Sequence, residues 1–132
     1  GLGQALSSLY DTVDCLEDCD VFINCKHDGY EQVELLYKAA ELNKRIINIG
    51  SNSPDENKRQ PHKYQIEKFA LDKANDQLFY QGINTTIIRF GFFDSPRVAG
   101  VDKPKMPISY CVSVIDWILE QPHRVKEITV TP

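Results

Sequence analysis

The sequence predicts an α/β protein built on a doubly wound parallel sheet, with helices on both faces in a three-layer α/β/α arrangement. The first observation is a set of short apolar runs rich in β-branched residues, at 20–25, 44–51, 84–90 and 126–131. The second is that segments with helical periodicity separate these runs, as the crossovers between parallel strands require. The third is length, because 132 residues can form one domain, residues 1–132, with a real core.

The chain before the second strand contains the shorter predicted elements. Residues 11–18 predict a short helix in which Val13 and Leu16 are apolar, and residues 20–25 predict a strand. This part of the sequence is short for a sheet of this class. We therefore expect it to be abbreviated at its N-terminal side.

A second helix and strand follow. Asp28 and Glu31 have the spacing of a capping box, which predicts a helix as far as Asn43, a residue that commonly ends helices. The run 44–51 has basic residues before it and Gly-Ser after it. This pattern is typical of a buried strand that leaves the core just before Gly50.

The second half of the chain repeats the alternation. A polar loop at 52–61 precedes a long helix that should end at Gly82, and the strand 84–90 comes next. Pro107 should begin another helix, which Pro122 ends, before the last strand. The polar segment 97–105 is expected to be a loop over the substrate.

Composition and charge exclude several classes of function. The net charge is −4 and no basic block is present, which argues against nucleic acid as a partner. No apolar run approaches the roughly 20 residues that a membrane span needs. The four cysteines and three histidines, which are Cys15, Cys19, Cys25, Cys111, His27, His62 and His123, form no metal-ligand pattern. We interpret the cysteines as reduced thiols of a cytoplasmic protein, and the histidines as surface or loop residues.

One group of side chains points to chemistry. Tyr64 and Lys68 lie one turn apart on the same face of a predicted helix, and Ser51 is expected at the nearby strand exit. A phenol normally titrates near ~10, and an ammonium one turn away favours the phenolate, which makes the tyrosine usable as a general acid or base. A serine hydroxyl can hold a substrate oxygen as its charge changes. These groups suit proton transfer to a carbonyl or from an alcohol, with a redox cofactor supplying the hydride.

The order of these residues resembles the short-chain dehydrogenase/reductase family. Asn48-Ile49-Gly50-Ser51 resembles that family's strand end, and it stands thirteen positions before the tyrosine of the Y-x-x-x-K motif, Tyr64 to Lys68. The resemblance implies a Rossmann-like fold, with Ser51 on the substrate oxygen and Tyr64 as acid/base. Lys68 would lower the tyrosine pKa and bond the nicotinamide ribose of NAD(P).

The resemblance also assigns cofactor-binding residues. The start of the chain resembles the end of the family's glycine-rich turn and the helix after it, and residues 91–96 resemble its nicotinamide-contacting segment. Asn24 matches the first asparagine of the family's D-x-L-V-N-N-A-G strand, whereas Cys25-Lys26-His27 departs from N-A-G. By this resemblance the cofactor residues, besides Tyr64 and Lys68, would be Gly1, Gly3, Asn24, Gly91, Phe93 and Ser95.

Three functions remain open at this point. The first is an NAD(P)-dependent oxidoreductase that interconverts a small-molecule carbonyl and alcohol, as a possible homodimer or homotetramer. The second is a catalytically inactive dinucleotide-binding or regulatory protein on the same fold. The third is a relative of the nucleotide-sugar epimerases, against which the short 97–105 segment argues. Only 16 residues separate Gly3 from Asp20, so we expect that this sequence lacks a leading strand and an internal segment of the family.

Overall fold

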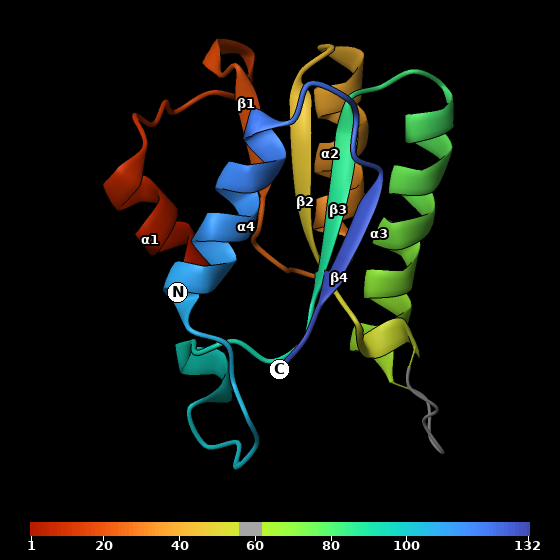
Figure 1. Cartoon of the computed structure of the whole chain (residues 1–132). Helices are drawn as coiled ribbons and strands as arrows, with labels where there is room; N and C mark the ends of the chain where they lie inside the picture. Colours follow the sequence, from red (N-terminus) through yellow and green to blue (C-terminus); the bar gives the residue numbers. More distant parts are fainter. Residues whose placement is uncertain (56–61) are drawn as a thin grey trace.

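The computed structural model has the predicted α/β architecture and describes residues 1–55 and 62–132 (Figure 1). Four strands alternate with helices along the chain. The strands are β1 (Val21–Asn24), β2 (Arg45–Ser51), β3 (Thr85–Phe90) and β4 (Glu127–Val130), and the helices are α1 (Leu2–Leu9), α2 (Glu31–Glu41), α3 (Lys63–Tyr80) and α4 (Ile108–Glu120). The predicted loop 52–61 lies outside the described residues beyond Asp55.

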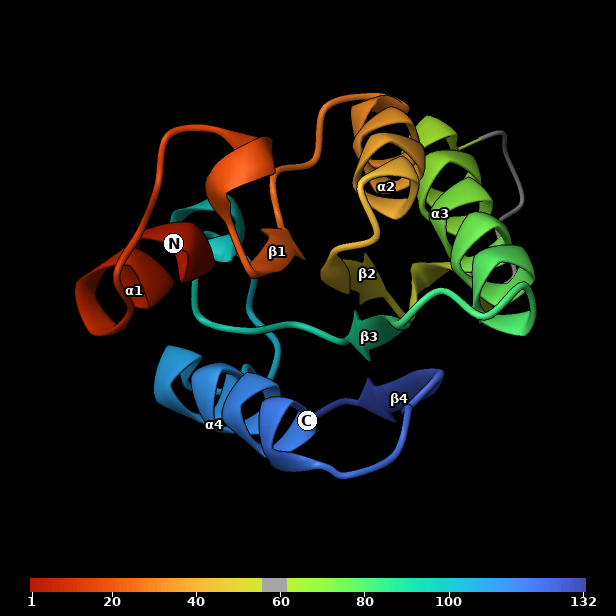
Figure 2. The ribbon, with the colours of Figure 1, turned by 90° about the horizontal axis from the view of Figure 1, so that it is seen from above.

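All strand pairs are parallel, and the strands lie side by side in the order β1-β2-β3-β4. The view from above shows α2 and α3 on one face of the sheet and α1 and α4 on the other (Figure 2). Each face has its own core, with Ile47 and Ile88 on the α4 side and Ile46 and Ile87 on the α3 side. The side chains alternate between faces because successive residues of a strand point in opposite directions.

The connection through α4 has the opposite hand from the other two crossovers. Each new strand is added on the same side of its predecessor, but α4 crosses on the face opposite to α2 and α3. Parallel crossovers are right-handed in nearly all proteins. The link from β3 to β4 is therefore an exception, and it brings α4 beside α1.

Most predicted boundaries are confirmed. The run at 44–51 forms the buried central strand β2, and α4 begins directly after Pro107. Asn43 has φ of 53° just beyond α2, and Gly82 has φ of 93° just beyond α3. Both residues take the left-handed conformation that ends a helix at little cost for Asn and Gly.

Three local predictions are wrong. Residues 11–18 contain only a 3-10 turn, Leu16–Asp18, because one apolar residue per turn gives too little surface to bury. The predicted capping box is not formed, since α2 begins after Tyr30 and no side chain caps it. Gly3 lies inside α1 and not in a turn before it.

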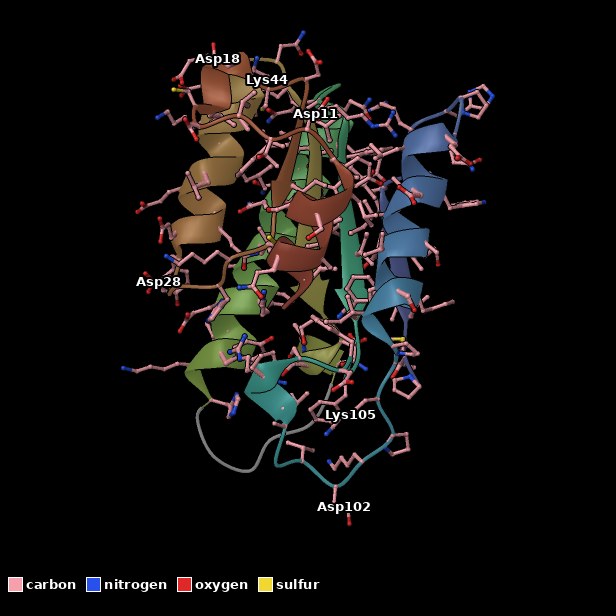
Figure 3. All side chains as sticks on the ribbon, turned by 90° about the vertical axis from the view of Figure 1, so that its left-hand side faces the viewer. Asp11, Asp18, Asp28, Lys44, Asp102 and Lys105 are labelled. Carbon is pink, nitrogen blue, oxygen red and sulfur yellow. The ribbon has the colours of Figure 1, made fainter. Side chains whose placement is uncertain are left out.

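The carboxyl ends of all four strands meet at one edge of the sheet, the lower edge in Figure 1. The loop between β3 and α4 extends beyond this edge, and Asp102 and Lys105 mark its tip in Figure 3. At the opposite edge, Lys44 Nζ donates to the Glu17 carbonyl at 2.8 Å and ties down the segment before β1. Functional side chains of parallel sheets gather at the carboxyl edge, so the candidate site is sought there.

The outer edge of β1 faces an open groove of about 1010 Å³, bounded by α1 and residues 10–20. β1 is the first strand of the sheet in the described part of the chain. No described helix is both long enough and apolar enough to cross a bilayer.

Candidate active site

Lys68 is buried between α3, α2 and the end of β2. Only 3% of the residue is exposed, and its Nζ donates to Gln32 Oε1 at 2.9 Å and to the Ile49 carbonyl at 3.0 Å. Burial, followed by the positive charge of Arg97, lowers the pKa of Lys68 from 10.5 to about 8. Lys68 therefore carries its charge at neutral pH against a desolvation cost, and two fixed acceptors hold it in place.

Tyr64 lies one turn before Lys68 on α3, as predicted, and its ring is surrounded by nitrogen groups. The Lys68 Nζ lies 5.6 Å from the ring centroid, and the Arg97 guanidinium carbon lies 4.6 Å from it. The imidazole of His27 packs edge-on against the same ring, with 4.8 Å between centroids. Among the described residues no group hydrogen-bonds the Tyr64 hydroxyl, which leaves the phenol available to a ligand.

Ser51 is the last residue of β2 and is 8% exposed. Its Oγ accepts a hydrogen bond from the Ser53 backbone N–H at 3.0 Å, within a turn that β2 enters as it leaves the sheet. Gln65 of α3 donates to the Ser53 carbonyl at 2.8 Å, which fixes the start of α3 against this turn. The hydroxyl of Ser51 keeps its proton to donate, because the bond to Ser53 uses only an oxygen lone pair.

His27 and Glu67 belong to the site although the sequence assigned neither of them a role there. His27 Nε2 lies 3.2 Å from Glu67 Oε2, and the two side chains are 14% and 13% exposed. Burial and then the charge of Lys68 lower the pKa of His27 below its ordinary value. His27 lies in a loop, as predicted, and it packs inward against Tyr64.

Gln32 was also missed. It is 2% exposed on the inner face of α2, where its Nε2 donates to the Asn24 carbonyl at 2.8 Å and to the Ile49 carbonyl at 3.2 Å. Its Oε1 accepts from Lys68. A glutamine four positions before buried Leu36 was a signal, because that spacing places a polar side chain on the core face.

Asn24 takes part in a row of polar side chains inside the sheet. Its Nδ2 donates to Asn48 Oδ1 at 2.9 Å and to the Gln32 carbonyl at 2.8 Å. Asn48 continues the row to Asn75 Oδ1 at 3.1 Å and to Thr85 Oγ1 at 3.0 Å. Asn24 is 2% exposed, so both of its N–H groups serve the interior and neither is free for a cofactor.

The other positions assigned to a cofactor divide into two groups. Gly3 of α1 lies at the end of β1, where a Cβ would stand 3.5 Å from Cys25 Sγ, and a Cβ on Gly1 would meet nothing within 4 Å. Gly91 is packed so closely against Thr131 that a Cβ there would overlap its hydroxyl. Gly1 and Gly3 thus lie at the carboxyl edge with space around Gly1, whereas Gly91 serves contact with the end of β4.

Phe93 and Ser95 come from the loop after β3. Phe93 packs against the core on the α4 side, with its ring 5.6 Å from that of Phe90, and bridges to Met106. Ser95 is half-buried and precedes the 3-10 turn Pro96–Val98 that carries Arg97. These two residues hold the loop in position over the carboxyl edge.

The arrangement as a whole can transfer a proton to or from a substrate oxygen. It combines a phenol that no described residue hydrogen-bonds with a buried ammonium beside that phenol. Ser51 lies at the end of β2, and among the described residues its hydroxyl bonds the Ser53 backbone and neither Tyr64 nor Lys68. An ammonium near the ring favours a negative oxygen, and a hydroxyl donor favours a developing charge on the substrate. No cluster of His, Cys, Asp and Glu suited to a metal ion occurs among the described residues.

No protein-family model matches this chain, and no curated protein matches it. Solved structures do match. An alcohol dehydrogenase from the archaeon Thermococcus sibiricus, complexed with 5-hydroxy-NADP, aligns with a TM-score of 0.66 at 14% identity over 98% of this chain and 66% of that one.

Two further structures are similar to the same degree. An apo SCOR enzyme from Clostridium thermocellum has a TM-score of 0.62 at 16% identity, over 85% of this chain and 60% of that one. A short chain dehydrogenase from Burkholderia cenocepacia J2315 in complex with NADP has a TM-score of 0.62 at 15% identity, over 97% and 65%. The chain thus spans between 60% and 66% of the length of these three enzymes, and at such identities the likeness establishes the fold alone.

Proposed function

We propose that this chain carries the catalytic centre of an NAD(P)-dependent oxidoreductase that interconverts a small-molecule carbonyl and an alcohol, with Tyr64 as the acid/base. The observation that supports this most is the buried Lys68 ammonium, held by two acceptors beside a phenol that has no hydrogen-bond partner among the described residues. Two of the similar enzymes described above are dehydrogenases, and both are complexes with NADP or a derivative of it. The four free cysteines fit a reducing compartment such as the cytoplasm.

The residues on the nicotinamide side of the site fit the cofactor. Two of the three N–H groups of Lys68 are used, which leaves one for a ribose hydroxyl, and Gly1 has open space at the start of α1. When bound, NAD(P) would supply or accept the hydride. Tyr64 would give its hydroxyl proton to the carbonyl oxygen, and Ser51 would donate a hydrogen bond to that oxygen and hold it in place.

The test is Tyr64→Phe, which removes the hydroxyl and keeps the ring. NADPH and NADH oxidation would be followed over a panel of aldehydes and ketones, and we expect turnover to fall by about 10²–10⁴-fold with an unchanged unfolding midpoint. Tyr110→Phe is the matched control, because Tyr110 is 47% exposed on α4. Equal turnover by wild type and Tyr64→Phe would refute the role of Tyr64.

A specific observation favours the alternative, a dinucleotide-binding or regulatory protein without catalysis. Both side-chain N–H groups of Asn24, which the resemblance assigned to the cofactor, are bonded inside the protein, so Asn24 cannot help to orient a bound dinucleotide for hydride transfer. Titration with NADPH, followed by its own fluorescence, separates the two proposals. Saturable binding without oxidation across the carbonyl panel supports the regulatory protein.

We also propose that the chain associates with itself through the outer face of α3. Ile66 and Phe69 are 57% and 56% exposed and lie three residues apart, on one face of the helix. Ile66→Lys combined with Phe69→Lys should give a monomer by size exclusion with light scattering. Trp117→Lys, which changes a residue 49% exposed on α4, should leave the mass unchanged. A wild type that is monomeric at high concentration would contradict this proposal.

A further inference from the structure

The charges around Tyr64 do not balance. Lys68 is a buried cation, and the Arg97 guanidinium lies over the ring of the same tyrosine. Two carboxylates act on Lys68, and each has another partner: Asp72 pairs with Arg89, and Glu67 lies against His27. The two charged groups over the Tyr64 ring, those of Lys68 and Arg97, are therefore both positive.

Arg97 has no carboxylate partner in the described part of the chain. Within residues 1–55 and 62–132, no Asp or Glu lies within ion-pair distance of its guanidinium. The other arginine close to the carboxyl edge, Arg89, shows the contrast, because it pairs with Asp55 at 2.7 Å and with Asp72 at 3.2 Å.

Arg97 lies over the Tyr64 ring, and its charge acts on two other groups of the site. Its charge is, after burial, the strongest influence that lowers the pKa of Lys68, and it also lowers the pKa of His27, after burial and the Lys68 charge. Arg97 comes from the 3-10 turn Pro96–Val98, in the loop that extends beyond the carboxyl edge. A loop residue that reaches back to the catalytic tyrosine can contact a substrate bound there.

We propose that Arg97 binds an oxyanion group of the substrate, a carboxylate or a phosphate, next to the carbonyl that Tyr64 would protonate. This inference rests on the proposed function and names the class of substrate. A guanidinium stacked on an aromatic ring keeps the N–H groups at its edge, which match two oxygens of a carboxylate or phosphate. The same anion would offset the charge that Arg97 and Lys68 bring together.

A purely structural role for Arg97 is the competing explanation. In that case the guanidinium over the Tyr64 ring only fastens the loop, through a cation–π contact. Such a contact would affect every ligand of the site equally. Only an anion-binding role discriminates between a charged ligand and its neutral counterpart.

The experiment measures binding to the full chain by protein NMR titration and requires no turnover. The ligands are two matched pairs: pyruvate with methyl pyruvate, and dihydroxyacetone phosphate with dihydroxyacetone. The variants are Arg97→Gln, which removes the charge, and Arg97→Lys, which keeps the charge but loses the paired N–H donors of the guanidinium. The control is Lys105→Gln, which removes a positive charge from the same loop (Figure 3).

We expect the wild type to prefer the anion of one pair. Arg97→Gln should lower the affinity for that anion by about tenfold or more, as expected when a hydrogen bond to a charged group is lost. The affinity for the neutral partner should not change. The affinity of Arg97→Lys for the anion should lie between those of the wild type and Arg97→Gln. The affinity of Lys105→Gln should equal that of the wild type. The pair that responds identifies the anion as carboxylate or phosphate.

Other outcomes overturn the inference. They are equal binding of an anion by wild type and Arg97→Gln, equal loss of the charged and neutral partners, and no binding of either anion by the wild type. Anion binding that depends on Arg97 in a chain that oxidises no NADPH would refute the oxidoreductase proposal and keep this one.

Discussion

Burial of Lys68 should make the stability of this protein rise with pH above neutrality. The unfolded chain holds the lysine proton up to about pH 10.5, whereas the folded protein releases it near a pKa of about 8. Between these values the unfolded state binds more protons, so the free energy of unfolding increases as pH rises. At 1.36 kcal/mol for each pKa unit, the penalty for the buried charge is about 3 kcal/mol at neutral pH. About 2 kcal/mol of it should be gone by about pH 9.5.

The assay compares wild type with Lys68→Met in urea at pH 7 and at about pH 9.5. The methionine keeps the length of the side chain and removes the charge, so the difference in unfolding free energy between the two proteins isolates Lys68 from other titrating groups. We expect wild type to gain about 2 kcal/mol relative to the variant over this range. Lys73→Met, at an exposed position of the same helix, should show no such gain.

The test is not whether Lys68→Met is more or less stable than the wild type at one pH. Lys68→Met relieves the desolvation penalty, but it also leaves Gln32 Oε1 and the Ile49 carbonyl without their donor, at a cost of about 1–3 kcal/mol for each group. These two effects oppose one another at any single pH, but only the relief of the desolvation penalty depends on pH. A difference between wild type and Lys68→Met that is the same at both pH values would refute the burial argument.

Two further changes test the packing that supports the site. Asn48→Ala should lower the free energy of unfolding, measured in urea, by roughly 2–4 kcal/mol. The reason is that Asn48 is fully buried and its loss leaves the neighbouring amides of the row without partners. A loss of stability no larger than that caused by substituting an exposed residue would contradict this role. Gly91→Ala should destabilise the protein by about 1–3 kcal/mol through overlap with Thr131, while Gly100→Ala, where a Cβ meets nothing within 4 Å, should not. If the two alanine substitutions changed the free energy of unfolding equally, the end of β4 would have moved to accommodate the new Cβ at no cost.

The centre of the sheet was predictable because β2 and β3 are buried on both faces. β2 is buried along almost its whole length between two helical layers, so its sequence is a continuous apolar run with turn residues at its end. The prediction of a helix over 11–18 was wrong because this segment buries little apolar surface. Of its two apolar residues only Leu16 packs against the core, whereas Val13 is 53% exposed, and local propensity alone does not hold a short helix.

The candidate site was predictable only where its residues are close in sequence. Tyr64 and Lys68 share a helix face, so their proximity follows from helix geometry. His27 and Arg97 come from loops after β1 and β3, and they meet Tyr64 because parallel strands bring their carboxyl ends together. The sequence pattern predicts where the strands end, but it does not predict which side chains of the following loops turn toward the site.

Gln32 shows why the predicted Tyr64 and Lys68 pair was an incomplete account of the site. On a helix surface a pair four residues apart is held by the helix alone, and an exposed lysine would sample many positions. Here Gln32 of α2 binds the backbone of both β1 and β2 and presents its oxygen to the Lys68 ammonium. A buried amide is costly unless its partners are all satisfied, and these three bonds satisfy it. The position of the ammonium therefore depends on two helices and two strands, and any change that moves α2 should displace Lys68 from Tyr64.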